Sequence, residues 1–402
     1  MKITTRRIVI LVSTLFVLVA FFHLYWYRKH AIRPRTVLIP SNPVVLEVAK
    51  SNKVATPEAI KVVPAVLVKQ GHIKEMNNAS QRVAVKDDNM GGADPKKAAS
   101  YQKPIVISIM TGHYLGDYGY RTSDAKKCFL EGIQLDCSLE GGDRVATADA
   151  TWHHIPHVGS AGGITPKKHP KQLRVGMSME SSAYYGQLDN KEYMKNYDIV
   201  MSYKLNSDVV THYFYNPPLL VPPRVPTAKK KNSVAYVNRN CGARNGRNEI
   251  VADLKKHYPV EAYGCLGSNQ RVDKIKVFSE SKFCIAMENS NAEYYVSEKL
   301  WHALESGCLP IYMGAPNIIQ DYIPDPKAII LYEPGVMTGK SLAEKLKKLE
   351  LNDDLYEEHM AWRKKSLSEL SPGFQRLMEL TKLPGPECQL CQVVAKKRFA
   401  ME

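Results

Sequence analysis

The chain has 402 residues, which exceeds one ordinary domain and predicts two domains with appended segments. Hydrophobic residues make up 44% of the chain, enough for a sizeable core, and lysine plus arginine outnumber aspartate plus glutamate by 55 to 40. The net charge of +15 favours an anionic partner, such as a phosphorylated substrate or an acidic membrane surface. Nucleic acid is not the partner we expect, because neither zinc-finger spacing nor an aromatic-interleaved basic stripe is present.

Residues 8–27, IVILVSTLFVLVAFFHLYWY, form an apolar run long enough to cross a bilayer. The run is longer than the apolar region of a cleavable signal peptide, and no small-residue cleavage site follows it. Tyr25, Trp26 and Tyr27 fit an interfacial aromatic belt. Basic residues flank both ends, so charge alone does not orient the segment. We expect a membrane-anchored protein with a cytosolic tail at residues 1–7, a transmembrane signal anchor and a lumenal body.

The number of cysteines also bears on the compartment, because an even number suits an oxidising compartment such as the lumen. Their pairing cannot be deduced from sequence. The pair in CQLC has no second CxxC that would complete a zinc site, so disulfide bonding is favoured there. Cys284 and Cys308 lie in apolar runs and are interpreted as buried thiols. Asn78, in Asn-Ala-Ser, is an acceptor sequon for N-glycosylation that also fits a lumenal body. The eight cysteines are Cys128, Cys137, Cys241, Cys265, Cys284, Cys308, Cys388 and Cys391.

Residues 28–100 are rich in Pro, Lys, Ala, Asn and Ser without sustained periodicity, which predicts a flexible stem. The apolar run KPIVISIM predicts a first buried strand, and ATADATWHHI predicts another. YDIVMSYKLNSDV predicts a strand around Ile199, after a helix near residues 191–197. Short apolar strands that alternate with helical stretches predict a parallel α/β domain over residues 101–225.

A proline-rich connection, YNPPLLVPPRVPTAKKKN, predicts the interdomain linker, and a second α/β domain is expected over residues 226–395. Its expected strands are SVAYV, residues 283–287, CLPIYMG and KAIILY, and NEIVADLKKHY is expected to be helical. After a loop at residues 288–294, Ser297 is a candidate N-cap and Gly307 a candidate C-cap of a helix. Residues 341–367 predict two amphipathic helices. The architecture expected is two α/β domains with a cleft between them.

Polar residues follow two strands of this second domain, at the edge where parallel α/β sheets bind ligands. NCGARNGR places Arg244 and Arg247 just before a helix, which favours an anion, although a solvated turn is an equal alternative. Lys299 lies in a first helical turn, where a positive charge is unfavourable because it opposes the helix dipole. An anionic ligand at this position would explain its presence. The Glu298 carboxylate could accept hydrogen bonds from ribose hydroxyls. The alternative is a local Glu–Lys surface cluster.

The string ENSNAEYYVSEKLWHALESGCLPIYMGAPNI resembles the donor-binding signature of the α1,3-fucosyltransferase family. NCGARNGR, YDIVMSYKLNSDV, GMSMESSAYY and CQLC are similar to the plant-type branch that modifies the N-glycan core, and the likeness covers most of residues 100–395. It implies two facing Rossmann-like domains of the GT-B type, the acceptor side first and the donor side second. Met287 departs from the family, which usually has Phe there, and Ser297 stands where the family often has Thr.

The resemblance also implies roles for individual residues. Glu180 matches the glutamate proposed as catalytic base. Lys299 and Arg247 are implied to contact the diphosphate, and Glu298 the ribose. The positions implied to hold GDP-fucose are Arg247, Asn289, Tyr295, Glu298 and Lys299.

The implied reaction transfers L-fucose from GDP-fucose to the 3-hydroxyl of the Asn-linked core GlcNAc of an N-glycan or glycoprotein, with inversion, in the Golgi membrane. The sequence has no Asp-x-Asp triplet, so protein cations are expected to hold the diphosphate. No cofactor is expected to be obligatory, and Mn²⁺ or Mg²⁺ is optional. Three alternatives remain open: the same chemistry on an outer-arm N-acetyllactosamine or a polypeptide, a catalytically silent lectin or scaffold, and a membrane-anchored basic binding module.

Overall fold

The computed structural model describes residues 94–111, 128–214 and 219–401. The chain divides into two compact units, residues 1–71 and 72–402, and all described residues lie in the second. The predicted tail, anchor and sequon at Asn78 therefore lie outside the described residues. Among the residues that are described, no helix is both long and apolar enough to cross a membrane.

The first sheet contains six parallel strands in the order β4-β1-β5-β6-β7-β8. The strands predicted from KPIVISIM, ATADATWHHI and the run around Ile199 are confirmed, whereas β6 was not predicted. The helix expected near residues 191–197 is present as the short α5, Lys191–Met194. The strands are β1 Ile105–Ile109, β4 Cys137–Gly141, β5 Ala150–His154, β6 Leu173–Ser178, β7 Ile199–Ser202 and β8 Val209–Val210.

The second sheet contains five parallel strands in the order β10-β9-β11-β12-β13. The α/β class with parallel sheets is thus confirmed. In chain order the strands run 2-1-3-4-5, so the direction of winding reverses between β9 and β11, and ligands of such sheets bind at this switch point. The strands are β9 Lys231–Asn238, β10 Val260–Gly264, β11 Ser281–Ile285, β12 Leu309–Tyr312 and β13 Ile330–Leu331.

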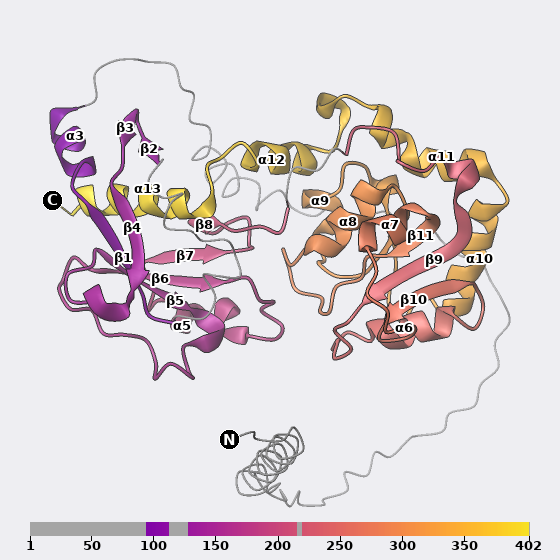
Figure 1. The fold of residues 1–402 in the computed structure, drawn as a ribbon, viewed down its shortest axis with the longest axis horizontal. Helices are drawn as coiled ribbons and strands as arrows, with labels where there is room; N and C mark the ends of the chain where they lie inside the picture. The colour runs from indigo at the N-terminus through magenta and orange to yellow at the C-terminus, as the bar shows by residue number, and fades with distance from the viewer. Residues whose placement is uncertain (1–93, 112–127, 215–218, 402) are drawn as a thin grey trace, which may run out of the picture. The chain divides into compact units, whose positions relative to one another are not determined.

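Helices cover both faces of the second sheet, because successive side chains of a strand point to opposite faces. Tyr236, Phe283 and Ile311 pack with one set of helices, and the neighbouring Cys284 and Tyr312 with the other (Figure 1). The first set is α6 Arg247–Leu254, α10 Gly339–Glu350 and α11 Asp353–Met360; the second is α7 Lys274–Ser279, α8 Glu298–Ser306, α9 Ile318–Asp321 and α12 Pro372–Leu380. Helices α10 and α11 are the two expected in residues 341–367.

The last helix, α13 Pro386–Phe399, packs on the first sheet and on α3, Pro95–Tyr101. The expectation that everything up to residue 395 belongs with the second sheet is therefore wrong for this helix. Leu390 and Val394 are fully buried in the core of the first sheet, and this apolar burial holds the helix there. Helix α3 also corrects the predicted stem, whose last residues are helical.

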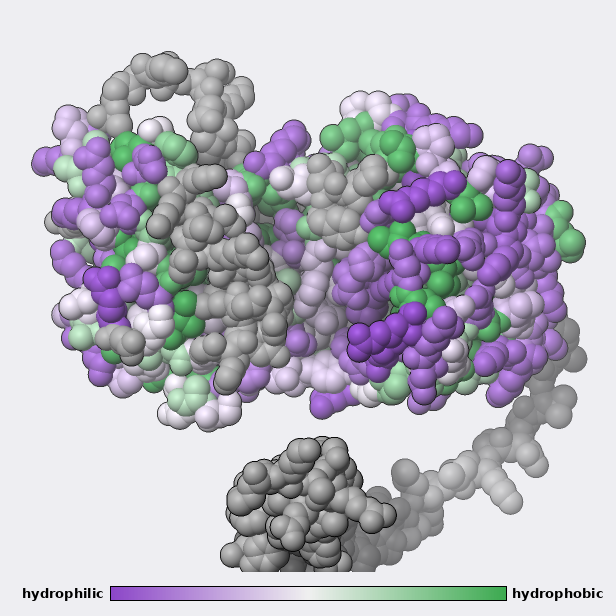
Figure 2. All heavy atoms as spheres, in the orientation of Figure 1, coloured by the Kyte–Doolittle hydropathy of each residue, from purple (hydrophilic) through white to green (hydrophobic). Residues whose placement is uncertain are grey.

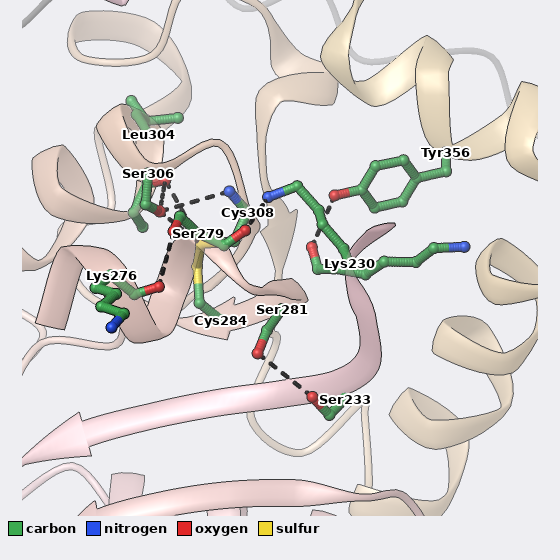
Figure 3. The surroundings of a disulfide bond; sticks show 12 residues. Lys230, Ser233, Lys276, Ser279, Ser281, Cys284, Leu304, Ser306, Cys308 and Tyr356 are labelled. Carbon is green, nitrogen blue, oxygen red and sulfur yellow. Dashed lines mark hydrogen bonds between the residues drawn. A yellow bond between two sulfur atoms is a disulfide. The ribbon is translucent and has the colours of Figure 1, made fainter. Parts of the chain in front are cut away.

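All eight cysteines form disulfides: Cys128–Cys388, Cys137–Cys391, Cys241–Cys265 and Cys284–Cys308. Of the two cysteines of CQLC, Cys391 binds Cys137 in β4 of the first sheet, and Cys388 binds Cys128, which lies in the core beside that sheet, so both bonds anchor α13 there. The interpretation of Cys284 and Cys308 as buried thiols is wrong. Figure 3 shows their disulfide beside Ser279 and Ser306 in the core, and both partners are buried. Cross-links of this kind stabilise mainly by restricting the unfolded chain.

Large exposed apolar side chains are scattered over the described surface. The most exposed are Leu351 at 86% and Val336 at 75%, and both lie beside helices of the second sheet. In Figure 2 the hydrophobic colour breaks into small areas between hydrophilic ones on the face shown. Hydrophilic residues, rather than a broad apolar patch, are the prominent feature of the described surface in that view.

His153 in β5 gives the fold a dependence on pH. The side chain is fully buried, and its Nε2 accepts a hydrogen bond from the Thr165 amide at 3.2 Å, which only the unprotonated nitrogen can do. Burial lowers the pKa of His153 from its ordinary 6.5 to about 4. Because the folded state holds the proton less tightly than the unfolded chain, stability is full above pH 6.5 and declines as the pH falls toward 4.

We therefore expect acid to destabilise the wild type more than a His153→Gln variant, whose amide oxygen can still accept from Thr165 but does not titrate. The His153 contribution amounts to about 1.4 kcal/mol per pH unit within that window. Urea unfolding of both proteins at pH 7 and pH 5 measures the difference. Equal losses of unfolding free energy in the two proteins would contradict the expectation.

Candidate functional site

The loops that follow β9 and β11 meet at the switch point of the second sheet. Residues 239–246 connect β9 to α6, and residues 286–297 connect β11 to α8. Asn245 joins the two loops, because its Nδ2 donates to the Glu288 carbonyl at 3.1 Å and to Asn291 Oδ1 at 2.8 Å. Cys241–Cys265 closes the first loop against the end of β10. A parallel sheet thus presents two cross-connected polar loops at its carboxyl edge.

Arg247, the first residue of α6, is fully buried between these loops. Its Nη1 donates to the Met287 carbonyl at 3.1 Å and its Nη2 to the Asn240 carbonyl at 2.8 Å. Its Nε has no hydrogen-bond partner among the described atoms. The guanidinium therefore ties the first loop to the second, and a direct contact of Arg247 with phosphate stays a prediction.

Glu288 is the site residue that the sequence did not single out. Its carboxylate is fully buried and accepts hydrogen bonds from the Ser297 amide at 2.8 Å and the Ser297 hydroxyl at 2.7 Å. Ser297 is the N-cap of α8, as predicted, but its hydroxyl binds Glu288 and Lys299 instead of capping the helix. Glu288 thus sets where α8 begins. The only signal was a carboxylate directly after an apolar strand, which usually marks a surface residue.

Lys299 and Glu298 lie in the first turn of α8 and complete a charged cluster with Glu288. Lys299 Nζ is 3.2 Å from Glu288 Oε2 and 3.7 Å from Glu298 Oε1. Burial alone would lower the pKa of Lys299, but Glu288 and then Glu298 outweigh it and raise that pKa. Burial alone would raise the pKa of Glu298, but Lys299 and Lys274 outweigh it and lower that pKa. Lys299 and Glu298 are therefore both ionised at neutral pH.

Tyr295 and Asn289 are placed differently from each other. Tyr295 is buried in the core of the first sheet, edge-on to Tyr203 with ring centroids 5.2 Å apart and to Tyr213 at 6.0 Å. Burial is the main cause that raises its pKa, so its hydroxyl stays protonated. Asn289 is half-buried, and its carbonyl accepts from the Tyr184 hydroxyl at 3.1 Å. Tyr295 thus packs the two sheets together, while a ligand contact by either residue stays a prediction.

Glu180 follows β6 in a segment that reaches the second sheet's loops. Ser181 Oγ lies 2.7 Å from Ser290 Oγ, and Tyr184 donates to the carbonyls of Asn289 and Gly242, both at 3.1 Å. The Arg244 guanidinium lies over the Tyr184 ring, 4.4 Å from its centroid. These contacts hold the Glu180 segment beside the loops that follow β9 and β11.

The Glu180 side chain itself is half-buried. No described residue forms a hydrogen bond or ion pair with its carboxylate, in contrast to the fully engaged Glu288. A carboxylate held in place through its backbone, with its oxygens uncommitted, is suited to accept a proton from a ligand hydroxyl.

Two further features bear on the location of the site. A cavity of about 470 Å³ lined by Asp149, His169, Lys171 and Arg398 lies at the amino ends of β5 and β6, the edge opposite to Glu180. Arg398 is already bound there to the carbonyls of Ser100, Lys103 and Pro104, so this cavity is a structural junction. Within the described ranges, no cluster of three or more His, Cys, Asp and Glu side chains could hold a metal ion.

The fold and the cluster define a doubly wound α/β protein whose switch-point site suits an anionic ligand. Residues 227–401 match the model for glycosyltransferase family 10 (fucosyltransferase), C-terminal part, and this range holds the whole cluster. A fucosyltransferase-like protein of Arabidopsis thaliana is 30% identical over 274 residues, 64% of this chain and 51% of that protein. The matched residues 227–401, less than half of this chain, are thus similar to glycosyltransferase family 10.

Other relatives carry a different name. GDP-fucose protein O-fucosyltransferase 3 of Xenopus laevis is 29% identical over 42% of this chain and 40% of its own length, and that of Homo sapiens is 27% identical over 41% and 39%. The chain spans about half the length, or less, of these curated relatives. Among solved structures, an α1,3-fucosyltransferase with GDP-fucose matches 76% of this chain and 95% of that one at 16% identity, with a TM-score of 0.47. A likeness that weak carries no argument about the site.

Proposed function

We propose that the protein is a fucosyltransferase that uses GDP-fucose as donor. The observation that carries the proposal is that the family 10 match covers the charged cluster at the switch point of the second sheet, in which Glu298 and Lys299 join the buried Arg247 and Glu288. Lys299 and the loop amides at this edge are chemically suited to a diphosphate, whose negative charge grows as GDP departs. Protein cations rather than an obligatory metal would hold it.

Glu180 would act as the base in this reaction. In a single displacement the acceptor hydroxyl attacks the fucose anomeric carbon opposite to GDP, the bond to the β-phosphate oxygen breaks, and the carboxylate takes the hydroxyl proton. The linkage inverts from β to α. The contacts of Ser181 and Tyr184 with the second sheet's loops support this role, because they bring the Glu180 segment to the donor side. The facing arrangement of the GT-B type belongs to the same proposal.

The acceptor has three candidates. The motifs shared with the plant-type branch favour the 3-hydroxyl of the Asn-linked core GlcNAc, giving an α1,3 linkage. The relatives named GDP-fucose protein O-fucosyltransferase 3 favour a serine or threonine hydroxyl of a polypeptide instead. Both reactions need the same donor site and a base at Glu180, so they differ only in what the first sheet's loops recognise. Outer-arm N-acetyllactosamine is a third, weaker candidate.

We further propose a type II Golgi membrane protein with residues 8–27 as its anchor. The support is the apolar run, the sequon at Asn78 and the four disulfides, since disulfides form and persist in oxidising compartments.

The full-length chain, incubated with GDP-fucose and each acceptor, tests the proposal. We expect tandem mass spectrometry to locate an added deoxyhexose on the core GlcNAc of a GlcNAc-terminated biantennary N-glycopeptide. Transfer to serine or threonine of a polypeptide lacking N-glycans would assign the second acceptor and overturn the first. Transfer to the outer arm would likewise keep the donor chemistry and change the acceptor. Failure to transfer to any of these acceptors and to hydrolyse GDP-fucose would contradict the proposed activity.

A further inference from the structure

Lys274, which the sequence did not single out, extends the charged cluster from a third element. It is the first residue of α7, and its ammonium lies 3.8 Å from Glu298 Oε1, the same oxygen that Lys299 approaches to 3.7 Å. Its side chain is only 19% exposed, compared with 17% for Lys299. The ammonium also lies over the Phe278 ring, 5.6 Å from its centroid. Lys274 is thus held between Glu298 of α8 and the Phe278 ring of its own helix.

The charges of this cluster do not balance among the described residues. Three cations, Arg247, Lys274 and Lys299, face two carboxylates, Glu288 and Glu298. His302 lies beside them and has a pKa lowered mainly by burial, so it adds no charge at neutral pH. Asp273, the carboxylate next to Lys274 in the chain, is exposed and caps α7, and Glu305 faces His302. An excess cation with little access to water is unfavourable unless an anion compensates it.

The positive charge of Lys274 is less well compensated than that of Lys299. Lys299 has Glu288 at 3.2 Å and Glu298 at 3.7 Å, and its pKa is raised. Lys274 has only the longer contact with Glu298, and burial lowers its pKa, with the positive charges of Lys299 and Arg247 adding to the effect. The negative charge of an anion next to Lys274 would counteract both contributions. Lys299, whose charge is better compensated, is the lysine that the family resemblance implies to bind the donor. Lys274, whose charge is less compensated, approaches the same Glu298 oxygen.

We propose that Lys274 is a donor-binding residue that contacts the diphosphate of GDP-fucose beside Lys299. The inference rests on the proposed function and deepens it. Because both ammonium groups approach one oxygen of Glu298, they lie close enough to bind one diphosphate together. Glu298 positions the two lysines before the ligand arrives. As the bond between fucose and GDP breaks, the electron pair stays on the diphosphate, and the Lys274 charge stabilises that leaving group.

Calorimetric titration of the full-length protein with GDP and with guanosine tests this assignment. We expect Lys274→Met to weaken GDP binding by about tenfold to a hundredfold, the loss of one charge-assisted contact, and to leave guanosine binding unchanged. Lys276→Met is the matched control, because Lys276 lies on the same short helix but is exposed. Lys274→Arg should retain most of the GDP affinity, and Lys274→Gln provides a polar variant of similar length should the Met variant fold poorly.

The outcomes separate the inference from the proposed function. If the wild type binds neither GDP nor GDP-fucose, the proposed function fails and the inference fails with it. If the wild type binds GDP and the Met and Gln variants of Lys274 bind it as tightly as Lys276→Met does, Lys274 is a structural partner of Glu298 and the inference alone is overturned. Equal weakening of GDP and guanosine binding would also overturn it, because that result indicates a distorted site rather than a lost phosphate contact.

Discussion

Replacement of Glu180 by glutamine is expected to lower the rate of fucosyl transfer by about 10²-fold to 10⁴-fold, the contribution typical of a general base. The amide has nearly the shape of the carboxylate but cannot accept a proton from the acceptor hydroxyl. The contacts that place the segment, made by the side chains of Ser181, Tyr184 and Tyr213, do not involve the Glu180 side chain. GDP-fucose binding should therefore stay within about twofold of the wild type, because the loss falls on the transition state.

Single-turnover rates and calorimetric donor affinity, measured on the same preparations, separate the two effects. Glu192→Gln is a suitable control. Glu192 lies in the short helix α5 that precedes β7 of the first sheet, is exposed, and forms an ion pair with Lys195. Retention of most of the activity by Glu180→Gln would remove Glu180 from the mechanism. A parallel loss of donor affinity would instead indicate that the carboxylate contributes to binding.

Local patterns were enough to predict much of the second sheet. The apolar run at residues 283–287 identified β11 within two residues, and the N-cap at Ser297 and the C-cap at Gly307 delimit α8 as expected. Gly307 has a φ of 75°, a left-handed conformation that glycine adopts without steric cost. Strand β6 was missed because Arg174 and Gly176 interrupt its apolar run. The position of α13 was missed because it depends on Cys128–Cys388, a contact across 260 residues that no local signal reports.

The site residues also divide into those that local sequence patterns reveal and those that only tertiary packing reveals. Sequence reasoning found Lys299 and Glu298 because a lysine in the first helical turn conflicts with the helix dipole, and this conflict is visible locally. It missed Glu288 and Lys274, since a glutamate after a strand and a lysine at a helix start are both ordinary surface features. Only the packing of the loop after β11, α7 and α8 gives these residues their roles, because it brings Glu288 to Lys299 and Lys274 to Glu298. The expected ligand role of Tyr295 did not anticipate its burial against the first sheet.

Replacement of Glu288 by alanine is expected to lower the free energy of unfolding by about 3 to 5 kcal/mol. The change leaves the Ser297 amide and hydroxyl without their buried acceptor and removes the nearer counter-charge of Lys299. Glu288→Gln should lose less, because its amide oxygen can still accept from Ser297. Glu293→Ala, an exposed glutamate of the same loop, should change stability by less than about 0.5 kcal/mol. Urea unfolding of the three variants and the wild type measures this order.

The same substitution links the core to the donor site. Glu288 joins the end of β11 to the first turn of α8, so its loss should displace Lys299 and Glu298 together and weaken GDP binding even where the protein remains folded. If Glu288→Ala unfolds within about 1 kcal/mol of the wild type and binds GDP equally well, the carboxylate does not organise the cluster. If stability falls while GDP affinity is preserved in the folded fraction, Glu288 serves the core alone. A loss of both would mean that one buried carboxylate sets the start of α8 and thereby the position of the cations that α8 carries.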